Sequence, residues 1–518
     1  MKKPVITSDE AANLIFNGAR VGIGGFVGIA VAEEIYIAIE NRFKNYGHPK
    51  DISLFFVAGQ GDGGKRGLSH FAYEGLLKRT IGGHYGLSPQ LQKLIANNKI
   101  EAYNFPQGTL NHILRDVAAG KKYTITKVGL NTFVDPDLEG GKLTPKTKED
   151  LVEKVKIHNE DHLLYKNGRL DFAILRGTYA DEKGNVSMEK EALTLENLSM
   201  AMAAKNSGGK VIVQVESIVE NGALNPQLVK IPGILVDYVV VAQDKKNQMQ
   251  TFAEDFNESY VKSNIIECGN TERYPFNLRK IIAKRAAMEL DDNMKVLNFG
   301  IGLPEVIVEV MKEERISSRF TPTVEPGGIG GNAAGGLSFG ASSAPEVIVD
   351  HAYQFDFYDG GGLDITFLGL AECDETGNVN VSKFGPKTAG CGGFIDISQN
   401  TQNVIFCGTF MAGKLETEIK NGQIRIIKDG KFSKFVKKVE QITFSSDFAK
   451  DHKQNVTYIT ERAVFKLING VFTLVEIAPG IDLEKDILSH LDFSLNIADD
   501  LKEIDRKVFI DEAMGLLK

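Results

Sequence analysis

The sequence predicts an α/β protein made of two tandem homologous domains, each a sheet between two layers of helices. Short apolar strands alternate with amphipathic helices, a strand–glycine turn–helix unit occurs in both halves, and a longer stretch of the first half recurs in the second. Alternating strands and helices are typical of layered α/β/α domains. The length of 518 residues also favours two cores over one.

The first half begins with a helix, which is followed by a strand, a glycine turn and a second helix. Thr7 and Glu10 have the spacing of a capping box, which predicts a helix that ends near Asn17-Gly18. The next elements are a strand in ARVGIGGF (19–26) and an amphipathic helix in AVAEEIYIAIENRF (30–43).

The second half repeats this order of elements. A helix, a strand with its glycine turn and another helix are predicted in NLRKIIAKRAAMEL (277–290), KVLNFGIG (295–302) and PEVIVEVMKEE (304–314). Pro304 suits the first turn of a helix, where its missing N–H costs nothing. The Gly-Ile-Gly triplets at 22–24 and 300–302 match at an offset of 278 residues.

A longer repeat follows in each half. LDFAILRGTYADEKGNV, from Leu170, matches LDITFLGLAECDETGNV, from Leu363, at an offset of 193 residues. The same offset aligns Val211-Ile212 with Val404-Ile405. We interpret this shared spacing as an internal duplication. The two offsets differ by 85 residues (278 minus 193), so the first half is expected to carry an insertion of about that size.

The duplication also predicts the domain boundaries. We expect an N-terminal domain at 1–242, which carries the insertion, and a C-terminal domain at 273–518. The polar run QDKKNQMQTFAEDFNESYVKSN (243–264) favours a linker at 243–272.

Composition and charge exclude several classes of function. The net charge is −8 with both signs interspersed, which leaves no basic footprint for nucleic acid, and no apolar run reaches the length of a membrane span. After Lys2-Lys3, the residues from Thr7 to Glu10 are polar where a signal peptide needs an apolar stretch. Cys268, Cys373, Cys391 and Cys407 show no C-x-x-C spacing, so they indicate no metal site and suit a reducing compartment. We therefore expect a cytoplasmic protein without nucleic-acid or membrane partners.

One carboxylate stands at the edge of a glycine-dense loop. In FTPTVEPGGIGGNAAGG (320–336), Glu325 follows an expected strand and precedes four glycines within six residues. Its first-half counterpart, VAGQGDGG (57–64), keeps the loop pattern but has Ala58 in place of Glu325. The carboxylate is therefore not needed to build the loop, which favours a reactive group over a charge that caps a turn.

A carboxylate in this setting suits nucleophilic chemistry. Glu is ionised at neutral pH from an ordinary pKa of about 4.3 and needs no partner base to attack an acyl centre. Amides of the glycine loop could stabilise the tetrahedral oxyanion. The resulting anhydride is reactive toward water, so the chemistry should be a transfer between bound partners in a site that excludes solvent.

Other motifs give weaker signals. The chain has no Walker-type phosphate loop, and GIGGFVG has Val27 where a dinucleotide fingerprint needs glycine. His158 and His162 are spaced like metal ligands on a helix, but Asn159 replaces the glutamate of a zinc protease, and a solvated surface helix is the better interpretation. His351, next to Asp350, either orients a loop near the site or is a satisfied buried histidine.

Several of these blocks together resemble the family I coenzyme A-transferases, and the resemblance is closest to single-chain members that act on acetate, propionate and other short-chain acyl groups. VEPGGIGG, DHAYQFDFYDGGGLDITFLGLAECDETGNVNVSKFG and VTYITERAVFKL occur in order and at sensible spacing. The resemblance covers essentially the whole chain. It implies two tandem CoA-transferase domains, alpha-subunit-like at 1–242 and beta-subunit-like at 273–518.

The resemblance implies a ping-pong exchange of coenzyme A between a short-chain acyl-CoA and a free carboxylate of the acetate, propionate, butyrate or acetoacetate class. Glu325 would carry coenzyme A covalently as a glutamyl thioester during turnover. No permanently bound cofactor and no metal are implied. The partners would be these substrates and further copies of the chain, in a dimer or tetramer.

The resemblance also assigns residues to roles. Glu325 is the catalytic residue, Gly24, Gly25 and Gln107 lie at the oxyanion or acyl site, and Gly300, Ile301, Gly302, Gly392 and Gly393 bind coenzyme A. For each glycine the alternative is a plain turn, and for Gln107 a loop amide. Many relatives have G-G-F-x-x-x-G-x-P in the first domain, whereas GGFVGIAVA has Ala30 and Ala32 at the last two of these positions. That difference leaves the specificity of this loop open.

Two other functions remain as alternatives. In an acyl-CoA hydrolase with the same glutamate, water would take the thioester, and coenzyme A would be released without an acceptor acid. A non-catalytic metabolite-binding protein on the same fold would bind ligand without turnover. The presence of a glutamate in only one of the two matching loops argues against the second alternative.

Overall fold

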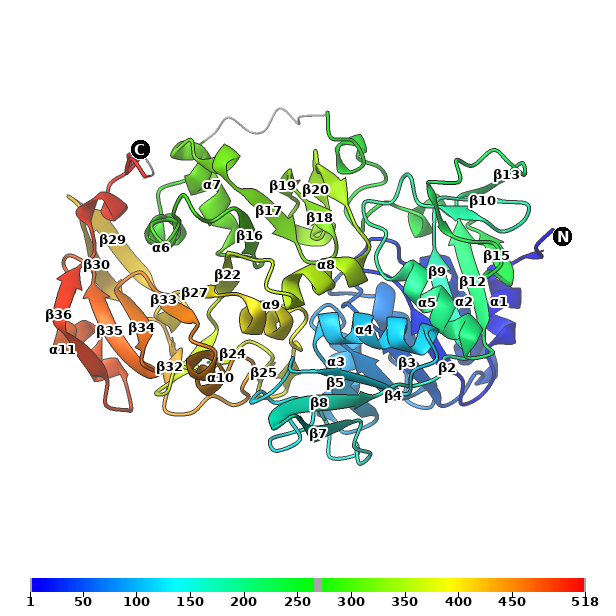
Figure 1. Ribbon diagram of the computed structural model, residues 1–518, viewed down its shortest axis with the longest axis horizontal. Coiled ribbons are helices and arrows are strands. Elements are labelled where there is room, and N and C mark those ends of the chain that lie inside the picture. The colour runs from blue at the N-terminus through cyan, green and yellow to red at the C-terminus, as the bar shows by residue number, and fades with distance from the viewer. Residues whose placement is uncertain (1, 265–272, 517–518) are drawn as a thin grey trace. The chain divides into compact units, whose positions relative to one another are not determined.

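The computed structural model, shown in Figure 1, describes residues 2–264 and 273–516. Contacts within the chain divide it into two compact units, each assembled from three stretches. Unit 1 consists of residues 1–267, 324–359 and 383–396, and unit 2 of residues 268–323, 360–382 and 397–518. Residues 265–272, with Cys268 and the end of the expected linker, lie outside the described residues.

Unit 1 contains an eight-stranded parallel sheet in the order β1-β15-β12-β9-β2-β3-β4-β5. The strands are β1 (Val5–Ile6), β2 (Arg20–Ile23), β3 (Ile52–Phe56), β4 (Leu77–Gly82), β5 (Glu101–Asn104), β9 (Phe172–Arg176), β12 (Lys210–Val215) and β15 (Tyr238–Val241). Strand β9 is buried along its whole length and β12 along all but its first residue, as expected for a parallel sheet covered on both faces.

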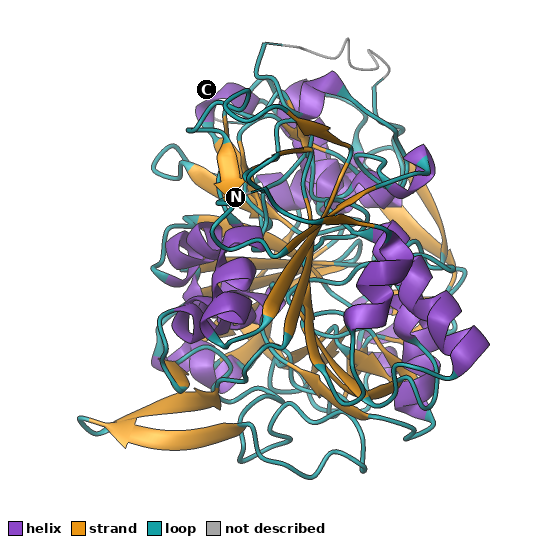
Figure 2. Ribbon diagram, turned by 90° about the vertical axis from the view of Figure 1, so that its right-hand side faces the viewer, coloured by secondary structure: helices purple, strands orange, loops and turns teal. Residues whose placement is uncertain are grey.

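Helices cover both faces of this sheet, as Figure 2 shows in a view along unit 1. They are α1 (Ser8–Leu14), α2 (Glu33–Tyr46), α3 (Pro89–Ala96), α4 (Gln107–Ala118) and α5 (Asn197–Asn206). Helix α1 packs on α2, and α4 packs on α5. The predicted capping box is present, because Thr7 and Glu10 each accept a hydrogen bond from the other's backbone N–H. The helix ends at Leu14, somewhat before the expected Asn17-Gly18.

Unit 2 is built on a second sheet, in which the strand order from β17 onward is β17-β16-β22-β27-β33-β34-β35-β36. Its first five strands are parallel, β34 is antiparallel to both neighbours, and β36 runs parallel to β35. The elements are α6 (Leu278–Ala287), β16 (Val296–Phe299), α7 (Glu305–Glu313), β17 (Thr321–Val324), β22 (Ile365–Gly369), α9 (Phe394–Asn400), β27 (Asn403–Cys407), α10 (Ser446–Asp451), β33 (Asn455–Ile459), β34 (Ala463–Ile468), β35 (Val471–Ile477), α11 (Leu483–Asp486) and β36 (Asn496–Glu503).

The two sheets share one topology. The order β15-β12-β9-β2-β3 in the first matches β33-β27-β22-β16-β17 in the second, and a helix precedes β2 and β16 and another follows each of them. The prediction of two tandem homologous α/β/α domains is therefore confirmed.

The repeated Asp-Glu-x-Gly-Asn sequence forms the same turn twice. Asp181 accepts hydrogen bonds from the backbone N–H of Lys183 and Asn185 and from the Asn185 side chain. Asp374 accepts the corresponding three bonds in unit 2, from the backbone N–H of Thr376 and Asn378 and from the Asn378 side chain. An Asp that bonds the backbone two residues on is a stable turn former, which explains why both copies keep it.

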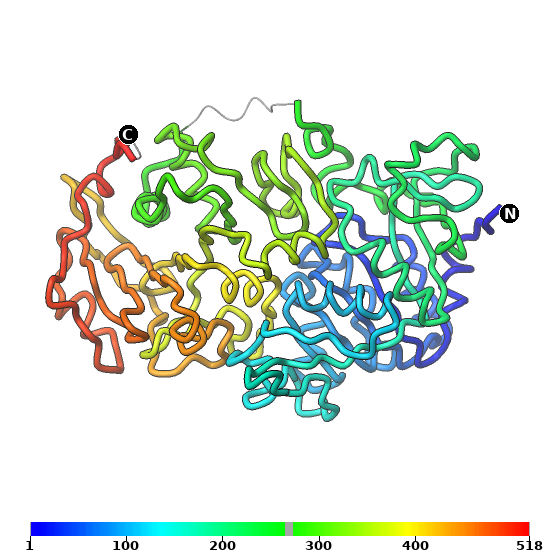
Figure 3. Tube along the Cα trace, in the orientation of Figure 1, coloured from blue at the N-terminus to red at the C-terminus, as the bar shows by residue number. Residues whose placement is uncertain are grey.

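The first half also holds elements that the second lacks. After α4 comes a small antiparallel sheet in the order β6-β8-β7, made of β6 (Tyr123–Thr126), β7 (Val152–Ile157) and β8 (Glu160–Lys166). The β7–β8 hairpin projects from unit 1 in Figures 2 and 3. The predicted surface helix at His158 and His162 is wrong, because His158 and Asn159 are the two turn residues of this hairpin. Both have positive φ, 49° and 68°, as a two-residue hairpin turn requires.

Shorter elements complete the two units. Unit 1 also contains β10 (Tyr179–Asp181), β11 (Val186–Ser187), β13 (Ser217–Val219), β14 (Val229–Ile231), β18 (Gly328–Ile329), β19 (Asn332–Ala333), β20 (Ser342–Ser343), β21 (Val347–Ile348), α8 (His351–Asp359), β25 (Lys383–Phe384) and β26 (Lys387–Thr388). Unit 2 also contains β23 (Glu372–Asp374), β24 (Val379–Asn380), β28 (Met411–Ala412), β29 (Glu416–Lys420), β30 (Gln423–Lys428), β31 (Phe432–Ser433) and β32 (Phe435–Val436). Over the described residues, no helix is both long and apolar enough to span a membrane.

Candidate active site

Glu325 directly follows β17, at the carboxyl end of a parallel strand, which is where α/β proteins most often bind ligands. The turn that it opens is tight. A Cβ at Gly327, which has φ of 126°, would lie 2.1 Å from the carbonyl oxygen of Val349. No other residue fits there without moving the backbone. The glycine is thus needed for the close approach of two segments beside Glu325.

Gln107, at the start of α4, faces this carboxylate. Its Nε2 lies 3.4 Å from Oε1 of Glu325, and the side chain is buried. Its backbone N–H donates to the carbonyl oxygen of Gly392 at 2.9 Å. The amide group is therefore held in place from both its backbone and its side chain.

The glycine segment before α9 forms another wall of the site. A Cβ at Gly393 would lie 2.9 Å from Oε2 of Glu325 and 3.0 Å from the ring of Phe355. The N–H of Gly392 donates to the carbonyl oxygen of Gly83 at 2.8 Å, and that of Cys391 to the Asn104 side chain at 2.9 Å. The segment is thus fixed against the loop after β4, and only glycine leaves room for the carboxylate.

His351, whose role the sequence left open, continues the network beyond Gln107. Its Nε2 lies 2.9 Å from Nε2 of Gln107, and its Nδ1 lies 3.0 Å from Oε2 of Glu196. The other oxygen of Glu196 accepts the backbone N–H of Gly25 at 3.2 Å. His351 and Glu196 are 0% and 1% exposed. Four side chains therefore form one continuous chain from a buried glutamate to Glu325.

Two carboxyl groups of the site, the partly buried Glu325 and the buried Asp396, have raised pKa values. Burial raises the pKa of Glu325, while the hydrogen bond from Gln107 opposes that rise. Burial also raises the pKa of Asp396, even though its oxygens accept the N–H groups of Gly108 and Thr109 in the first turn of α4. The negative charge of Glu325 adds to the rise at Asp396. The site therefore holds Glu325 as a poorly solvated carboxylate.

The amides of Gly24 and Gly25 are already bonded. Gly24 N–H donates to the carbonyl oxygen of Ile174 at 3.2 Å, and Gly25 N–H donates to Glu196. The same loop holds Val27 and Ala30 at φ of 53°, a left-handed conformation that costs a non-glycine residue about 1–2 kcal/mol. Ala30 thus keeps the backbone conformation that glycine would adopt at this position.

The predicted coenzyme A turn, Gly300 to Gly302, lies in unit 2. It follows β16 and precedes α7, and Ile301 is 62% exposed. Beside it, a cavity of about 390 Å³ opens at the carboxyl ends of β22 and β27, with Leu303 in its wall. Two cations, Arg279 and Lys434, also line it. The Nζ of Lys434 donates to the carbonyl oxygen of Leu370 at 2.9 Å, and burial lowers its pKa.

Unit 1 therefore brings together Glu325, Gln107, Gly392 and Gly393, all of which the sequence singled out. It adds Glu196 and Asp396, which no motif had indicated because their positions depend on contacts between distant segments. Within the described residues no cluster of three or more His, Cys, Asp or Glu side chains suits a metal ion.

Comparison with known proteins identifies the family. The sequence profile described as coenzyme A transferase matches residues 5–242. The chain is 44% identical over 516 residues to caffeate CoA-transferase of Acetobacterium woodii, covering 99% of this chain and 98% of that protein. It is 42% identical over 518 residues to acetate CoA-transferase YdiF of Escherichia coli K12, covering 99% and 96%. The chain therefore belongs to the coenzyme A transferase family, as the resemblance predicted.

The fold agrees with this assignment. The crystal structure of the YdiF apoenzyme from Escherichia coli O157:H7 matches with a TM-score of 0.93 at 41% identity, covering 100% of this chain and 98% of that one. A YdiF structure described as a thioester complex with CoA matches equally well. The chain is thus an enzyme that transfers coenzyme A between an acyl-CoA and a carboxylate.

Proposed function

We propose that the chain transfers coenzyme A between short-chain acyl-CoA and free short-chain carboxylates through a thioester on Glu325. The observation that carries this proposal is the placing of one poorly solvated carboxylate against the Gln107 amide and the Gly392-Gly393 backbone. The similarity to YdiF, one of whose structures is described as a thioester complex with CoA, supports the same chemistry.

The reaction begins when a Glu325 oxygen attacks the thioester carbonyl of an acyl-CoA. The C–S bond breaks, leaving an acyl-glutamyl anhydride and CoA thiolate. The thiolate then attacks the glutamyl carbonyl, which releases the first carboxylate and leaves glutamyl-CoA thioester. An incoming carboxylate reverses both steps and leaves as the new acyl-CoA. Both half-reactions conserve charge and need no external proton.

The surroundings of Glu325 suit these steps. Its raised pKa reflects weak solvation of the carboxylate, and a weakly solvated carboxylate is a stronger nucleophile toward the thioester. The Gln107 amide is a donor within reach of Glu325 that can stabilise an oxyanion as the carbonyl becomes tetrahedral. We propose that Gly24 and Gly25 contribute through their small size and donate no hydrogen bond to the substrate. A Cβ at Gly25 would lie 2.8 Å from Val31 Cγ2.

The cavity in unit 2 is our candidate for the phosphate-bearing part of coenzyme A. It lies at the carboxyl ends of two parallel strands, next to the turn made by Gly300, Ile301 and Gly302. Arg279 and Lys434 supply positive charge, and no carboxylate among the described residues forms an ion pair with either of them. A phosphate near Lys434 would favour the charged form that burial disfavours.

The class of carboxylic acid that the enzyme exchanges is also a proposal. The names of the two similar enzymes specify an aromatic acid, caffeate, and a small one, acetate. We propose the acetate, propionate, butyrate and acetoacetate class because VEPGGIGG and the block after it resemble the short-chain members most. We also retain as proposals the domain boundaries 1–242 and 273–518, a cytoplasmic location and a homodimer or homotetramer.

Steady-state kinetics test this function. With propionyl-CoA and acetate as substrates, double-reciprocal plots should give parallel lines, the signature of a ping-pong mechanism. Glu325→Ala should lower kcat by about 10⁴-fold or more, as loss of a covalent nucleophile does. Glu375→Gln, a change in an exposed turn, is the control and should leave kcat unchanged.

Two results would contradict the proposal. Release of CoA at the same rate with and without acetate would indicate a hydrolase. Retention of transfer in Glu325→Ala would remove Glu325 from the mechanism.

A further inference from the structure

The hydrogen-bond chain behind Gln107 fixes which atoms carry protons. The Gln107 side-chain nitrogen carries two hydrogens and lies 3.4 Å from Glu325 Oε1 and 2.9 Å from His351 Nε2, so it can donate one hydrogen to each of them. If the Gln107 N–H donates to His351, Nε2 of His351 must be unprotonated and act as the acceptor. The ring proton must then lie on Nδ1, where Glu196 accepts it. Every contact in the chain is satisfied by this one arrangement.

Gly25 helps to hold Glu196 in place as a hydrogen-bond acceptor. The Glu196 Oε1 accepts the Gly25 N–H and its Oε2 accepts the His351 Nδ1–H, so both oxygens act as acceptors. A buried acceptor pair of this kind is what sets a histidine tautomer. Neither Glu196 nor His351 lies within hydrogen-bond distance of Glu325 among the described residues, so both act through Gln107.

We infer that Glu196 and His351 are positioning residues that hold the Gln107 amide with its N–H toward the reacting carboxylate. The inference rests on the proposed function for its catalytic consequence, though not for the tautomer itself. If His351 carried its proton on Nε2, two donors would face each other, and the Gln107 amide would flip. Its oxygen would then face Glu325, and the oxyanion donor would be lost.

Glu196→Gln tests this inference most sharply, because it replaces one carboxylate oxygen by an NH₂ group and leaves the shape of the side chain unchanged. Gly25 N–H still needs an acceptor, so the Gln oxygen stays there and its NH₂ group faces Nδ1 of His351. The histidine is driven to the Nε2–H tautomer. Loss of one oxyanion donor lowers kcat by about 10²–10³-fold, which is the upper limit for this variant. We expect at least about a tenfold fall in kcat with the KM for acyl-CoA within about twofold.

His351 offers a matched pair of variants. His351→Gln places an acceptor near the position of Nε2 and should retain kcat within about tenfold. His351→Phe keeps the ring but removes the acceptor, and its kcat should fall as far as that of Glu196→Gln.

Nitrogen NMR on protein labelled with ¹⁵N-histidine identifies the tautomer of His351 independently of enzymatic activity. The chain has nine histidines, and the difference spectrum against His351→Gln identifies the ring in question. We expect a protonated Nδ1 in the wild type and a protonated Nε2 in Glu196→Gln. An Nε2–H or doubly protonated ring in the wild type would overturn the inference, as would an unchanged kcat in Glu196→Gln. An enzyme without transfer activity that shows the expected tautomers would refute the proposed function alone.

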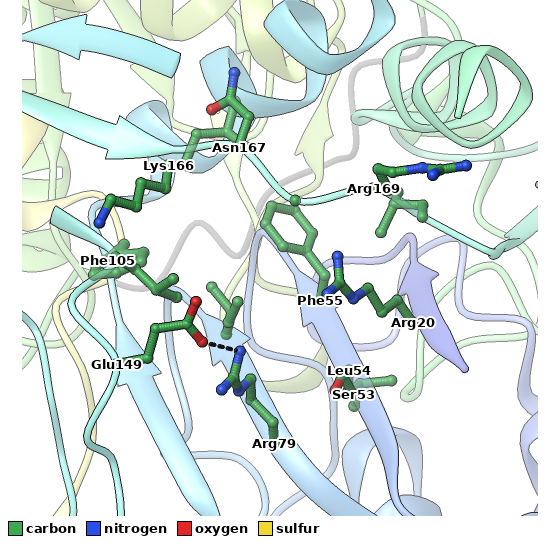
Figure 4. Close-up of a pocket in the computed structure, with 15 residues that line it drawn as sticks. Arg20, Ser53, Leu54, Phe55, Arg79, Phe105, Glu149, Lys166, Asn167 and Arg169 are labelled. Carbon is green, nitrogen blue, oxygen red and sulfur yellow. Dashed lines mark ion pairs between the residues drawn. The ribbon is translucent and has the colours of Figure 1, made fainter. Parts of the chain in front are cut away.

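A second observation concerns a cavity in unit 1, away from these residues. It measures about 150 Å³ and lies on the sheet face of β3 and β4, below the segment that joins β8 to β9 (Figure 4). Parallel sheets are normally covered on both faces, yet Phe55 and Ile81 remain partly exposed here. Leu54, Phe105 and Ile113 complete an apolar lining.

The mouth of this cavity is cationic. Arg79 is paired with Glu101 and Glu149, and Lys166 is paired with Glu153. Arg20, at the mouth, forms no ion pair with any carboxylate that the structure describes. Figure 4 shows Arg20 beside Phe55, with Lys166 and the Arg79–Glu149 pair across from them. Arg169 also lines the cavity, and its guanidinium donates to the carbonyl oxygen of Ser207. An apolar cavity with a guanidinium at its mouth that no carboxylate neutralises complements a small amphipathic anion.

We propose that this cavity binds a monocarboxylate with one ring or a short chain, at a second site separate from Glu325. The volume matches that of the engineered cavity of about 150 Å³ that holds benzene. Benzoate is therefore a suitable probe, since its ring fits the lining and its carboxylate can reach Arg20.

Calorimetric titration of the full-length protein with benzoate tests this site. We expect saturable binding of benzoate with a dissociation constant below about 10 mM. Arg20→Gln should bind it at least about fivefold more weakly, and Ile81→Trp, whose larger side chain fills the cavity, should not bind it. Benzyl alcohol, which keeps the ring without the charge, should bind more weakly than benzoate. The exposed Arg20 change leaves the core intact, so it remains informative if Ile81→Trp does not fold. Absence of binding, or binding that Arg20→Gln leaves unchanged, would overturn the proposal.

Discussion

At the residue scale, the central feature is a carboxylate that folding makes costly to ionise. The pKa of Glu325 is raised by burial, against the opposing effect of the hydrogen bond from Gln107. In the unfolded chain the group titrates at its ordinary value. The folded protein therefore binds this proton more tightly than the unfolded chain does. The stability associated with Glu325 is full below the unfolded pKa and is lost as the pH rises through the folded pKa.

This sign predicts that the active-site glutamate lowers stability at working pH. Glu325→Gln should have a higher melting temperature than the wild type at pH 8, and the difference should shrink toward pH 4, where the wild-type carboxyl is protonated. Thermal unfolding at several pH values measures this, with Glu220→Gln, an exposed change, as the control. A wild type that melts above Glu325→Gln at pH 8 would contradict the account.

The sequence could indicate Glu325, Gln107 and Gly393 because each belongs to a recognisable motif. It could not settle His351, for which an orienting role and a buried satisfied role stood as alternatives, and the structure places it in direct contact with Gln107. Glu196 was missed altogether. It lies in LTLENL, where nothing marks it apart from other glutamates, and its importance arises from a contact with a residue 155 positions away.

At the element scale, the duplication preserves turns as well as strands. The Asp-Glu-x-Gly-Asn turns after β9 and β22 use the same three hydrogen bonds to one buried aspartate. The sequence revealed this repeat because turn chemistry is local. It did not reveal the β7–β8 hairpin at His158, since histidines spaced four residues apart are typical of a helix, and the left-handed turn between the strands depends on the whole hairpin.

The two turns predict matched losses of stability. Asp181→Ala removes the acceptor for three donors, and Asp374→Ala removes the acceptor for the matching three and for two more, the Thr376 hydroxyl and the Val439 N–H. Hydrogen bonds to charged groups contribute about 1.5–3 kcal/mol. Each variant should lose at least about 2 kcal/mol of unfolding free energy, or about 4–8 °C in melting temperature for domains of this size. Scanning calorimetry measures the shift, with exposed Asp492→Ala as the control. A shift below 1 °C in both variants would show that these turns are dispensable.

At the scale of the whole molecule, the sequence predicted the two-fold repetition but not the way the chain divides into compact units. The shared strand order is readable because strands and helices recur at fixed offsets. By their contacts, however, residues 324–359 and 383–396 belong to unit 1, although the duplication places them in the second half. No local pattern encodes such membership, because it depends on packing between segments distant in the chain.

The most direct test of the central claim is the intact mass of the protein after incubation with acetyl-CoA and no acceptor acid. The account predicts a mass increase of one CoA less water in the wild type, located by peptide mapping to the segment that contains Glu325, with release of acetate. Glu325→Ala should show no increase. A CoA adduct on another residue, an adduct that persists in Glu325→Ala, or no adduct in the wild type would contradict a glutamyl thioester at this site.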